Sequence, residues 1–148
     1  MSETHNYISQ WLRLAQNDLA SANHLLGLRP YKLEVICYLC EQSAEKMLKG
    51  YLACKEMEVS KTHDLMKLCR LCMEVDKEFD ELFDSCSRLM PYGVQVRYPN
   101  HAELYEEDMH MALKDSKKIM DMIQPKMLII LEQVRDEIQD EINGMELL

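Results

Sequence analysis

Hydrophobic residues recur at three- and four-residue steps along most of this chain, which is the spacing of helices that bury one face. The clearest stretch is 31–57, where the apolar positions are Val35, Ile36, Leu39, Ala44, Met47, Leu48, Tyr51 and Leu52. Only four glycines and four prolines interrupt the 148 residues, and aromatic residues are scarce. Long helices are therefore favoured over strands, and the pattern predicts an all-α fold.

The same periodicity predicts helices before and after this central stretch. They cover residues 6–26, 31–57, 62–75, 79–89 and 102–123, with a last amphipathic piece at 126–143. Gly27 and Pro30 leave only a tight link between the first two helices, which makes them antiparallel. Thr62 is the expected N-cap of the third. We expect an up-and-down bundle of four to five antiparallel helices, and the pattern leaves open whether residues 62–90 form one kinked helix or two.

Pro125 is expected to end the fifth helix, because proline breaks the hydrogen bonding of a helix interior. The chain is then divided into a bundle, residues 1–124, and a C-terminal amphipathic helix, residues 125–148, which packs on the bundle or on a partner. The fifth helix has acids in its first turns and Lys114, Lys117 and Lys118 in its later turns. This order complements the dipole of a helix that ends near residue 123.

Residues 91–102 form the least helical part of the chain and the longest expected loop. Two prolines, a glycine and an asparagine occur there, together with Tyr92, Arg97, Tyr98 and His101. Loops of this length often carry function, and these four side chains are all suited to binding or chemistry.

The formal net charge of −9 argues against a surface that binds nucleic acid through bulk charge, but it leaves room for a small basic site. No apolar run approaches the length of a membrane span, and no secretory leader is evident. We therefore expect a cytoplasmic protein that does not associate with membranes.

Six cysteines are many for such a chain, and in the cytoplasm they would be reduced thiols. The pairs Cys37/Cys40 and Cys69/Cys72 have the spacing of a four-thiolate zinc site. Both pairs lie inside helical patterns and not in glycine-rich turns, which favours packing over metal binding. We expect neither a metal nor a cofactor, and zinc remains the alternative.

Four short motifs occur in order along the chain: Trp11-Leu12-x-x-Ala15-x-x-Asp18-Leu19, Cys37-Tyr38-x-x-Glu41-Gln42-Ser43-Ala44-Glu45-Lys46-x-Leu48-Lys49-x-Tyr51-Leu52, Lys61-Thr62-His63-Asp64-Leu65 and Arg97-Tyr98-Pro99. Together they resemble the HEPN domain family over about residues 6–123. The resemblance implies a bundle of four or five helices that is often dimeric, in agreement with the periodicity.

The resemblance also implies two functional options. Many family members are ribonucleases or toxins with an Arg-x(4–6)-His motif, and others act with a small nucleotidyltransferase partner or are associated with nucleotide binding. Here only three residues separate Arg97 from His101, one fewer than the motif requires. Our leading hypothesis is therefore a non-enzymatic protein that binds a nucleotide or RNA, or that serves a nucleotidyltransferase in a toxin-antitoxin-like system, and that forms a homodimer.

The phosphate-binding residues in this hypothesis are Lys46, Lys49, Lys61, His63, Arg97 and Tyr98. The first alternative is a metal-independent ribonuclease, in which Arg97 would bind the scissile phosphate and His101 would help to activate the 2′-hydroxyl. The second is a structural dimer or adaptor without a ligand.

Each candidate also has a purely structural interpretation. The lysines of the second helix could pair with nearby acids, and His63 could cap its helix or bind a neighbouring loop. Arg97 could lock the long loop by pairing with an acid such as Asp18, and His101 could cap the fifth helix.

Overall fold

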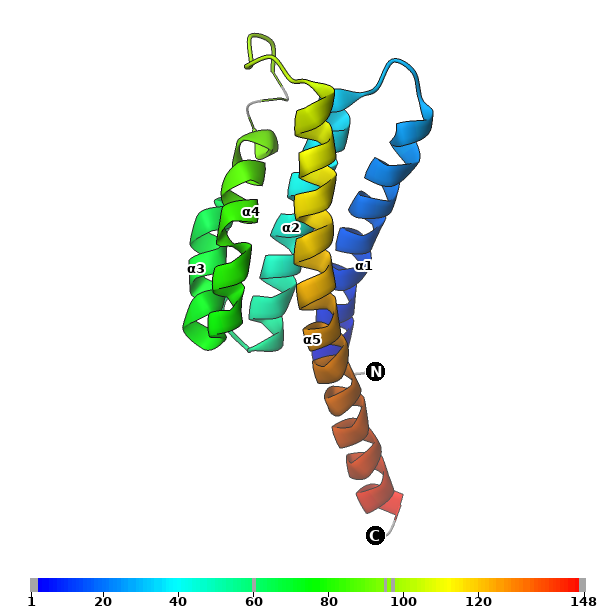
Figure 1. Ribbon diagram of the computed structural model, residues 1–148. Helices are drawn as coiled ribbons and strands as arrows, with labels where there is room; N and C mark the ends of the chain where they lie inside the picture. Colours follow the sequence, from blue (N-terminus) through cyan, green and yellow to red (C-terminus); the bar gives the residue numbers. More distant parts are fainter. Residues whose placement is uncertain (1–2, 60, 95, 97, 147–148) are drawn as a thin grey trace.

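The computed structural model describes residues 3–59, 61–94, 96 and 98–146, and these form a bundle of helices (Figure 1). The α-helices are α1 (Glu3–His24), α2 (Leu33–Cys54), α3 (Leu65–Val75), α4 (Phe83–Leu89) and α5 (Glu106–Glu146). Short 3₁₀ helices follow α1 (η1, Leu25–Gly27), precede α4 (η2, Lys77–Leu82) and follow it (η3, Met90–Gly93). No strand occurs among the described residues, so the predicted all-α fold is confirmed.

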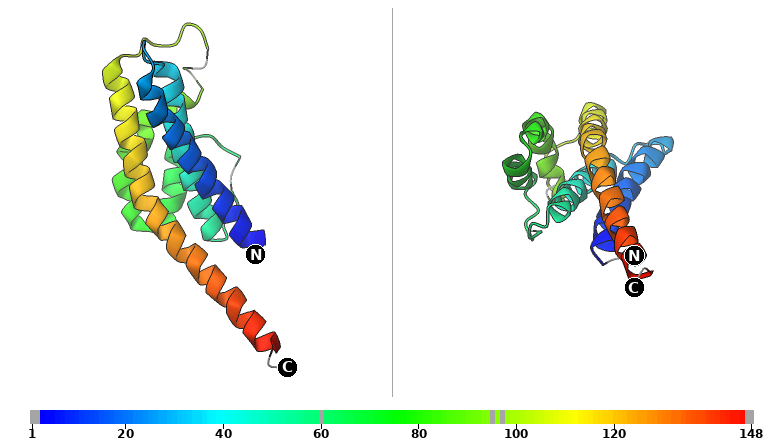
Figure 2. Two further views of the ribbon diagram at one scale, coloured as in Figure 1. Left: turned by 90° about the vertical axis from the view of Figure 1, so that its right-hand side faces the viewer. Right: turned by 90° about the horizontal axis from the view of Figure 1, so that it is seen from below.

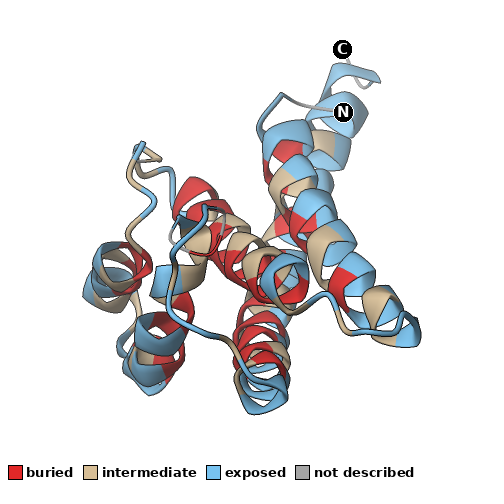
Figure 3. Cartoon of the chain, turned by 90° about the horizontal axis from the view of Figure 1, so that it is seen from above, coloured by how far each residue is buried: buried red, intermediate tan, exposed pale blue. Residues whose placement is uncertain are grey.

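Helix α2 is the centre of the bundle, because α1, α3, α4 and α5 all pack against it. Four of its large apolar side chains, Ile36, Met47, Leu48 and Leu52, are fully buried, whereas Val35 is exposed. Figure 3 shows the buried positions on the inward sides of the helices. Each such side chain contributes about 1.5–3 kcal/mol when it leaves water, so the central helix predicted from periodicity is also the main source of core stability.

Residues 62–90, whose helical structure the sequence left open, form two antiparallel helices. Asp76 lies between them in an extended conformation, and its carboxylate accepts a hydrogen bond from the Glu78 backbone N–H at 3.0 Å. The return segment, residues 55–59 and 61–64, runs back along α2 before α3 begins (Figure 2). As a result α3 runs in the same direction as α2, and its Cys72 thiol donates to the backbone carbonyl of Leu48.

The expected N-cap of α3 was wrong by two residues. Asp64 caps this helix, since its Oδ1 accepts a hydrogen bond from the Lys67 backbone N–H at 3.1 Å. The Thr62 hydroxyl instead accepts from the Asp64 N–H at 3.2 Å. Both residue types cap helices well, and the turn made by Thr62 places Asp64 at the cap position.

The expected helix break at Pro125 was also wrong, because α5 continues through this residue to Glu146. Pro125 and Asp121 both lie on the exposed side of α5. The Asp121 carbonyl, which loses its helical N–H partner, can therefore be hydrated, and the helix bends without ending. Figure 2 shows this bend in the middle of α5. The division of the chain at residues 124 and 125 into two units stays a prediction.

The last turns of α5 extend beyond the other helices (Figures 1 and 2). Residues 132–146 are exposed or only partly buried. Within the described part of the chain, no helix combines the length and the apolar character that a membrane crossing requires.

Gly50 is predicted to be essential for the close packing of α1, α2 and α5. A Cβ added there would lie 2.7 Å from Met127 Cε and 2.9 Å from Trp11 Cβ. Met127 has a flexible end, but the Trp11 Cβ is attached directly to the α1 backbone. Gly50→Ala should therefore lower the free energy of unfolding by about 1–3 kcal/mol, measured by chemical denaturation.

Gly27→Ala is the matched control, since a Cβ added at Gly27 would have no neighbour within 4 Å. Equal stability of the two variants would contradict the packing found at Gly50.

Candidate functional site

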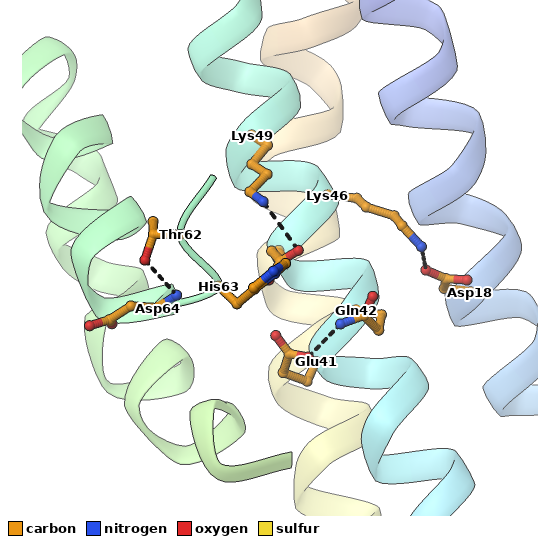
Figure 4. Close-up of polar contacts among 9 residues, drawn as sticks. Asp18, Glu41, Gln42, Lys46, Lys49, Thr62, His63 and Asp64 are labelled. Carbon is orange, nitrogen blue, oxygen red and sulfur yellow. Dashed lines mark hydrogen bonds and ion pairs between the residues drawn. The ribbon is translucent and has the colours of Figure 1, made fainter. Parts of the chain in front are cut away.

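A strip of polar side chains lies along the side of α2 that faces α1 and the return segment. Its members are Glu41, Gln42, Glu45, Lys46 and Lys49, which follow one another at alternating one- and three-residue steps. Figure 4 labels all of them except Glu45. Glu41, Glu45 and Lys49 are buried although all three can carry charge. Buried charges are tolerated when they are paired and hydrogen-bonded, so the contacts of this strip determine what it can do.

Glu45 is the centre of the strip and is 5% exposed. Lys49, one turn further along α2, places Nζ 3.4 Å from Glu45 Oε2. His63, from the return segment, places Nδ1 2.9 Å from Glu45 Oε1. Because a carboxylate only accepts hydrogen bonds, Nδ1 of His63 carries the proton, and Nε2 is the acceptor of the neutral ring. The His63 side chain is 71% exposed, so a buried acid holds a histidine at the surface.

Lys46 points to the other side of the strip, where it forms an ion pair with Asp18 of α1. Both side chains are mostly buried, with 22% and 18% of their surface exposed. The expected pairing of a helix lysine with an acid is therefore present at both Lys46 and Lys49. In the isolated protein, both lysines are already bound to carboxylates.

The loop residues are only partly described. Arg97, one of the phosphate ligands predicted from the sequence, lies outside the described residues. Tyr98 is 59% exposed, and Lys61 is exposed beside His63 in the chain.

His101 lies near the beginning of α2 and not beside Glu45. Its Nδ1 is 2.6 Å from the Ala102 carbonyl, and its Nε2 is 3.5 Å from Glu34. Glu34 precedes Glu45 by eleven residues, which corresponds to about 16 Å along a helix. The structure thus brings together Lys46, Lys49 and His63, and it places His101 outside the strip, at the beginning of α2.

Glu41 is a residue that the sequence reasoning missed. Its side chain is fully buried, and Gln42 Nε2 donates to its Oε2 at 2.9 Å. Its Oε1 has no hydrogen-bond partner within the described structure. A Cβ on Gly93 of η3 would lie 2.8 Å from the carboxylate, so the backbone of η3 approaches this acid closely. Burial raises the pKa of Glu41 to about 7, and the charge of Glu45 adds to the effect.

A signal for this burial was present in the sequence. Leu48 follows Glu41 by seven residues, which is close to two helical turns, and therefore lies on the same side of α2. The search for apolar periodicity passed over Glu41 because it is an acid.

Metal binding was tested by the positions of the possible ligands. The described residues contain no group of three His, Cys, Asp or Glu side chains that could hold a metal ion. Cys37 and Cys40 are buried, and burial raises the pKa of the Cys37 thiol to about 12. The Cys69 thiol donates to the Phe79 carbonyl at 3.4 Å. These cysteines therefore pack as small hydrophobic residues with weak S–H hydrogen bonds.

Glu41→Gln is predicted to change how stability depends on pH. The folded protein holds the Glu41 proton up to about pH 7, whereas the unfolded chain releases it near pH 4.5. Between these values the folded state binds more protons, so the contribution of Glu41 to stability falls as pH rises. Relative to the wild type, the glutamine variant should therefore gain about 2–3 kcal/mol between about pH 5 and about pH 8, measured by urea unfolding.

Glu106→Gln, at an exposed acid of α5, is the control for this series. If the difference in stability between Glu41→Gln and the wild type is independent of pH, the carboxyl of Glu41 does not titrate near neutrality.

Comparison with known proteins agrees with this architecture. The crystal structure of ST0689, an archaeal HEPN homologue, superposes with a TM-score of 0.64 at 21% identity and covers 81% of this chain and 97% of its own. The crystal structure of TT1696 from Thermus thermophilus gives a TM-score of 0.55 at 25% identity, with 86% and 98% of the two chains covered. No match was found among curated proteins. The model of the HEPN domain matches residues 8–127, and the chain belongs to the HEPN domain family.

Proposed function

We propose that this protein binds a phosphate-bearing ligand, either a nucleotide or an RNA end, where the return segment meets the polar strip of α2. The observation that carries the proposal is the exposed His63 held on buried Glu45. A ring fixed in this way loses little conformational freedom when it binds, and the protonated imidazole donates from Nε2 as well. Lys61 lies two residues away in the chain and is also exposed, so a fixed positive charge lies close in the chain to an imidazole that can take up a proton.

The paired lysines determine which ligands the site favours. A phosphate can contact His63 and Lys61 without breaking an ion pair, but it must displace Asp18 or Glu45 to bind Lys46 or Lys49 directly. Displacing a carboxylate from a largely buried pair is costly. Together with the net charge of −9, this favours a small ligand or a strand end over a long RNA.

The loop residues Arg97 and Tyr98 remain proposed ligands. The exposed ring of Tyr98 is suited to stacking on a base, as aromatic side chains do in single-strand binding. Membership of the HEPN family supports, as further proposals, a nucleotidyltransferase partner in a toxin-antitoxin-like pair and a homodimeric state.

Phosphate binding predicts a measurable stabilisation of the folded protein. Saturation with AMP or ATP should raise the melting temperature, because a ligand at a hundred times its Kd stabilises the folded state by about 2.7 kcal/mol. His63→Ala and Lys61→Ala should each weaken binding about tenfold in isothermal titration, since a charge-assisted hydrogen bond contributes about 1.5–3 kcal/mol. Adenosine should bind much more weakly than AMP.

Lys77→Ala is a matched control, because this exposed lysine lies on η2, away from α2's polar strip. The affinity for one RNA oligonucleotide should also be measured with and without a 5′-phosphate. This comparison separates recognition of a strand end from nucleotide binding. Binding that is equal for AMP and adenosine, or that survives His63→Ala and Lys61→Ala, would exclude this site.

The ribonuclease alternative stays a prediction, and the geometry of His101 makes a direct test useful. For His101 to accept a proton from a 2′-hydroxyl, Nε2 would have to leave Glu34. We expect no cleavage of labelled RNA in EDTA by the wild type. Cleavage that both Arg97→Ala and His101→Ala abolish would establish the nuclease instead.

A further inference from the structure

The C-terminal extension of α5, residues 132–146, keeps an apolar side after the helix has left the bundle. The side of α5 that packs on the bundle through the buried Met127 and Leu131 continues along the extension. There it consists of four apolar residues at three- and four-residue steps, which we call the terminal stripe: Val134, Ile138, Ile142 and Met145. None of the four is buried, and exposure reaches 44% at Ile142 and 72% at Met145.

The extension stands clear of the other helices (Figures 1 and 2). It also lies beyond residues 8–127, which match the HEPN domain. From Leu131 to Glu146 it measures about 22 Å, or roughly four helical turns. A helix of this length with one exposed apolar stripe is typical of segments that dock into a groove on another protein.

The extension also carries more than half of the net negative charge of the protein. Residues 132–146 contain six acids and one arginine, which gives −5 of the formal net charge of −9. Glu137 and Glu141 lie one turn apart along one edge of the terminal stripe, whereas Asp136 and Asp140 lie on the opposite side of the helix. Within the described part of the chain, neither Glu137 nor Glu141 forms an ion pair. The acids at the edge of the stripe are therefore available to a cationic partner.

The end of the bundle from which the extension leaves is acidic as well. Helix α1 begins at this end (Figure 1), and Glu3, Glu56 and Glu58 line an open groove there. A partner that covers the terminal stripe therefore meets negative charge both on the helix and beside it.

This charge disfavours three of the possible occupants of the terminal stripe. A nucleic acid and an anionic membrane surface are both repelled, because each carries fixed negative charge. A second extension, packed stripe against stripe, brings a charge of −5 against another charge of −5. The occupant that fits is a protein surface that supplies apolar area together with positive charge.

We propose that the extension of α5 docks on a partner protein, with the terminal stripe in an apolar groove that has lysine or arginine at its border. Ile138 and Ile142 are the central anchors, one turn apart, and Val134 and Met145 are the outer ones. Glu137 and Glu141 pair with the basic border of the groove and set the orientation of the helix. This surface is separate from the phosphate site on α2, so the proposal does not depend on that site.

A basic groove also supplies what the extension lacks in isolation. Isolated helices of about 12–15 residues are only marginally stable in water, and the extension has this length. Its last turns contain Glu141 and Glu146, which oppose the helix dipole. Cations on the partner would neutralise these acids, and burial of the terminal stripe would stabilise the helix.

A synthetic peptide with the required chemistry tests the proposal. The probe is an amphipathic helix with leucine at heptad positions a and d and lysine at e and g. Its controls are a scrambled peptide of the same composition and a helix with glutamate in place of the lysines. Fluorescence anisotropy on the full chain should show that the basic helix binds at least about tenfold more tightly than either control, and that salt weakens its binding.

Two pairs of matched variants assign the binding to the terminal stripe. Ile138→Asp should weaken binding of the basic helix at least about tenfold, because a charge replaces an apolar anchor. Ile129→Asp is its control and should change the affinity by less than about twofold, since Ile129 is 57% exposed on the opposite side of α5. The double variant Glu137→Lys/Glu141→Lys should weaken binding more than Asp136→Lys/Asp140→Lys, although both change the net charge equally.

The proposal is overturned if the basic helix binds no better than the scrambled peptide, or if Ile129→Asp weakens binding as much as Ile138→Asp. It is also overturned if Ile138→Asp converts a dimeric wild type into a monomer in sedimentation velocity, because a second copy would then cover the stripe. Binding to phosphatidylcholine vesicles that Ile138→Asp abolishes would assign the stripe to a lipid surface instead. Circular dichroism and AMP affinity should be unchanged in all variants, so that docking and phosphate binding are tested separately.

Discussion

The structure depends on the neutralisation of one buried acid, Glu45. Helix α2 must be covered on nearly all sides to form the core, yet it carries charged residues along one of them. An unpaired carboxylate at 5% exposure would be strongly destabilising, and the partners come from both near and far in the chain: Lys49 one turn away and His63 from the return segment. The contact with His63 anchors the return segment to α2 and thereby helps to fix where α3 begins.

This neutralisation also limits the chemistry of the surface. The strip contains several cations, but its lysines are paired, and the histidine is the group that the buried acid presents to solvent. Such a surface discriminates between ligands by the ion pairs that each ligand must break in order to bind, and not by the total charge of the surface. The unpartnered oxygen of Glu41 beside η3 adds a group that changes its protonation near neutrality without leaving the core.

The sequence predicted those features that depend on local periodicity, namely the helices and the central place of α2. Prediction from the sequence failed where two local rules compete, or where a contact with a distant part of the chain determines the local structure. Thr62 and Asp64 are both good caps, and only the course of the return segment selects Asp64. Asp18 was a possible partner for Arg97, but the packing of α1 on α2 brings Lys46 to it. Glu41 shares a side of α2 with the apolar Leu48, but the covering of this side by η3 depends on the path of the chain beyond α2.

The continuity of α5 changes the meaning of its charges. With a break at Pro125, Lys114, Lys117 and Lys118 would lie in the last turns of a helix, where they complement its dipole. In the observed helix they lie in the first half, and the dipole acts only on the terminal turns. The true C-terminal turns contain Glu141 and Glu146, which the dipole disfavours by about 0.3–1 kcal/mol each. The dipole therefore does not explain this order of charges, because Pro125 leaves both halves on one continuous helix.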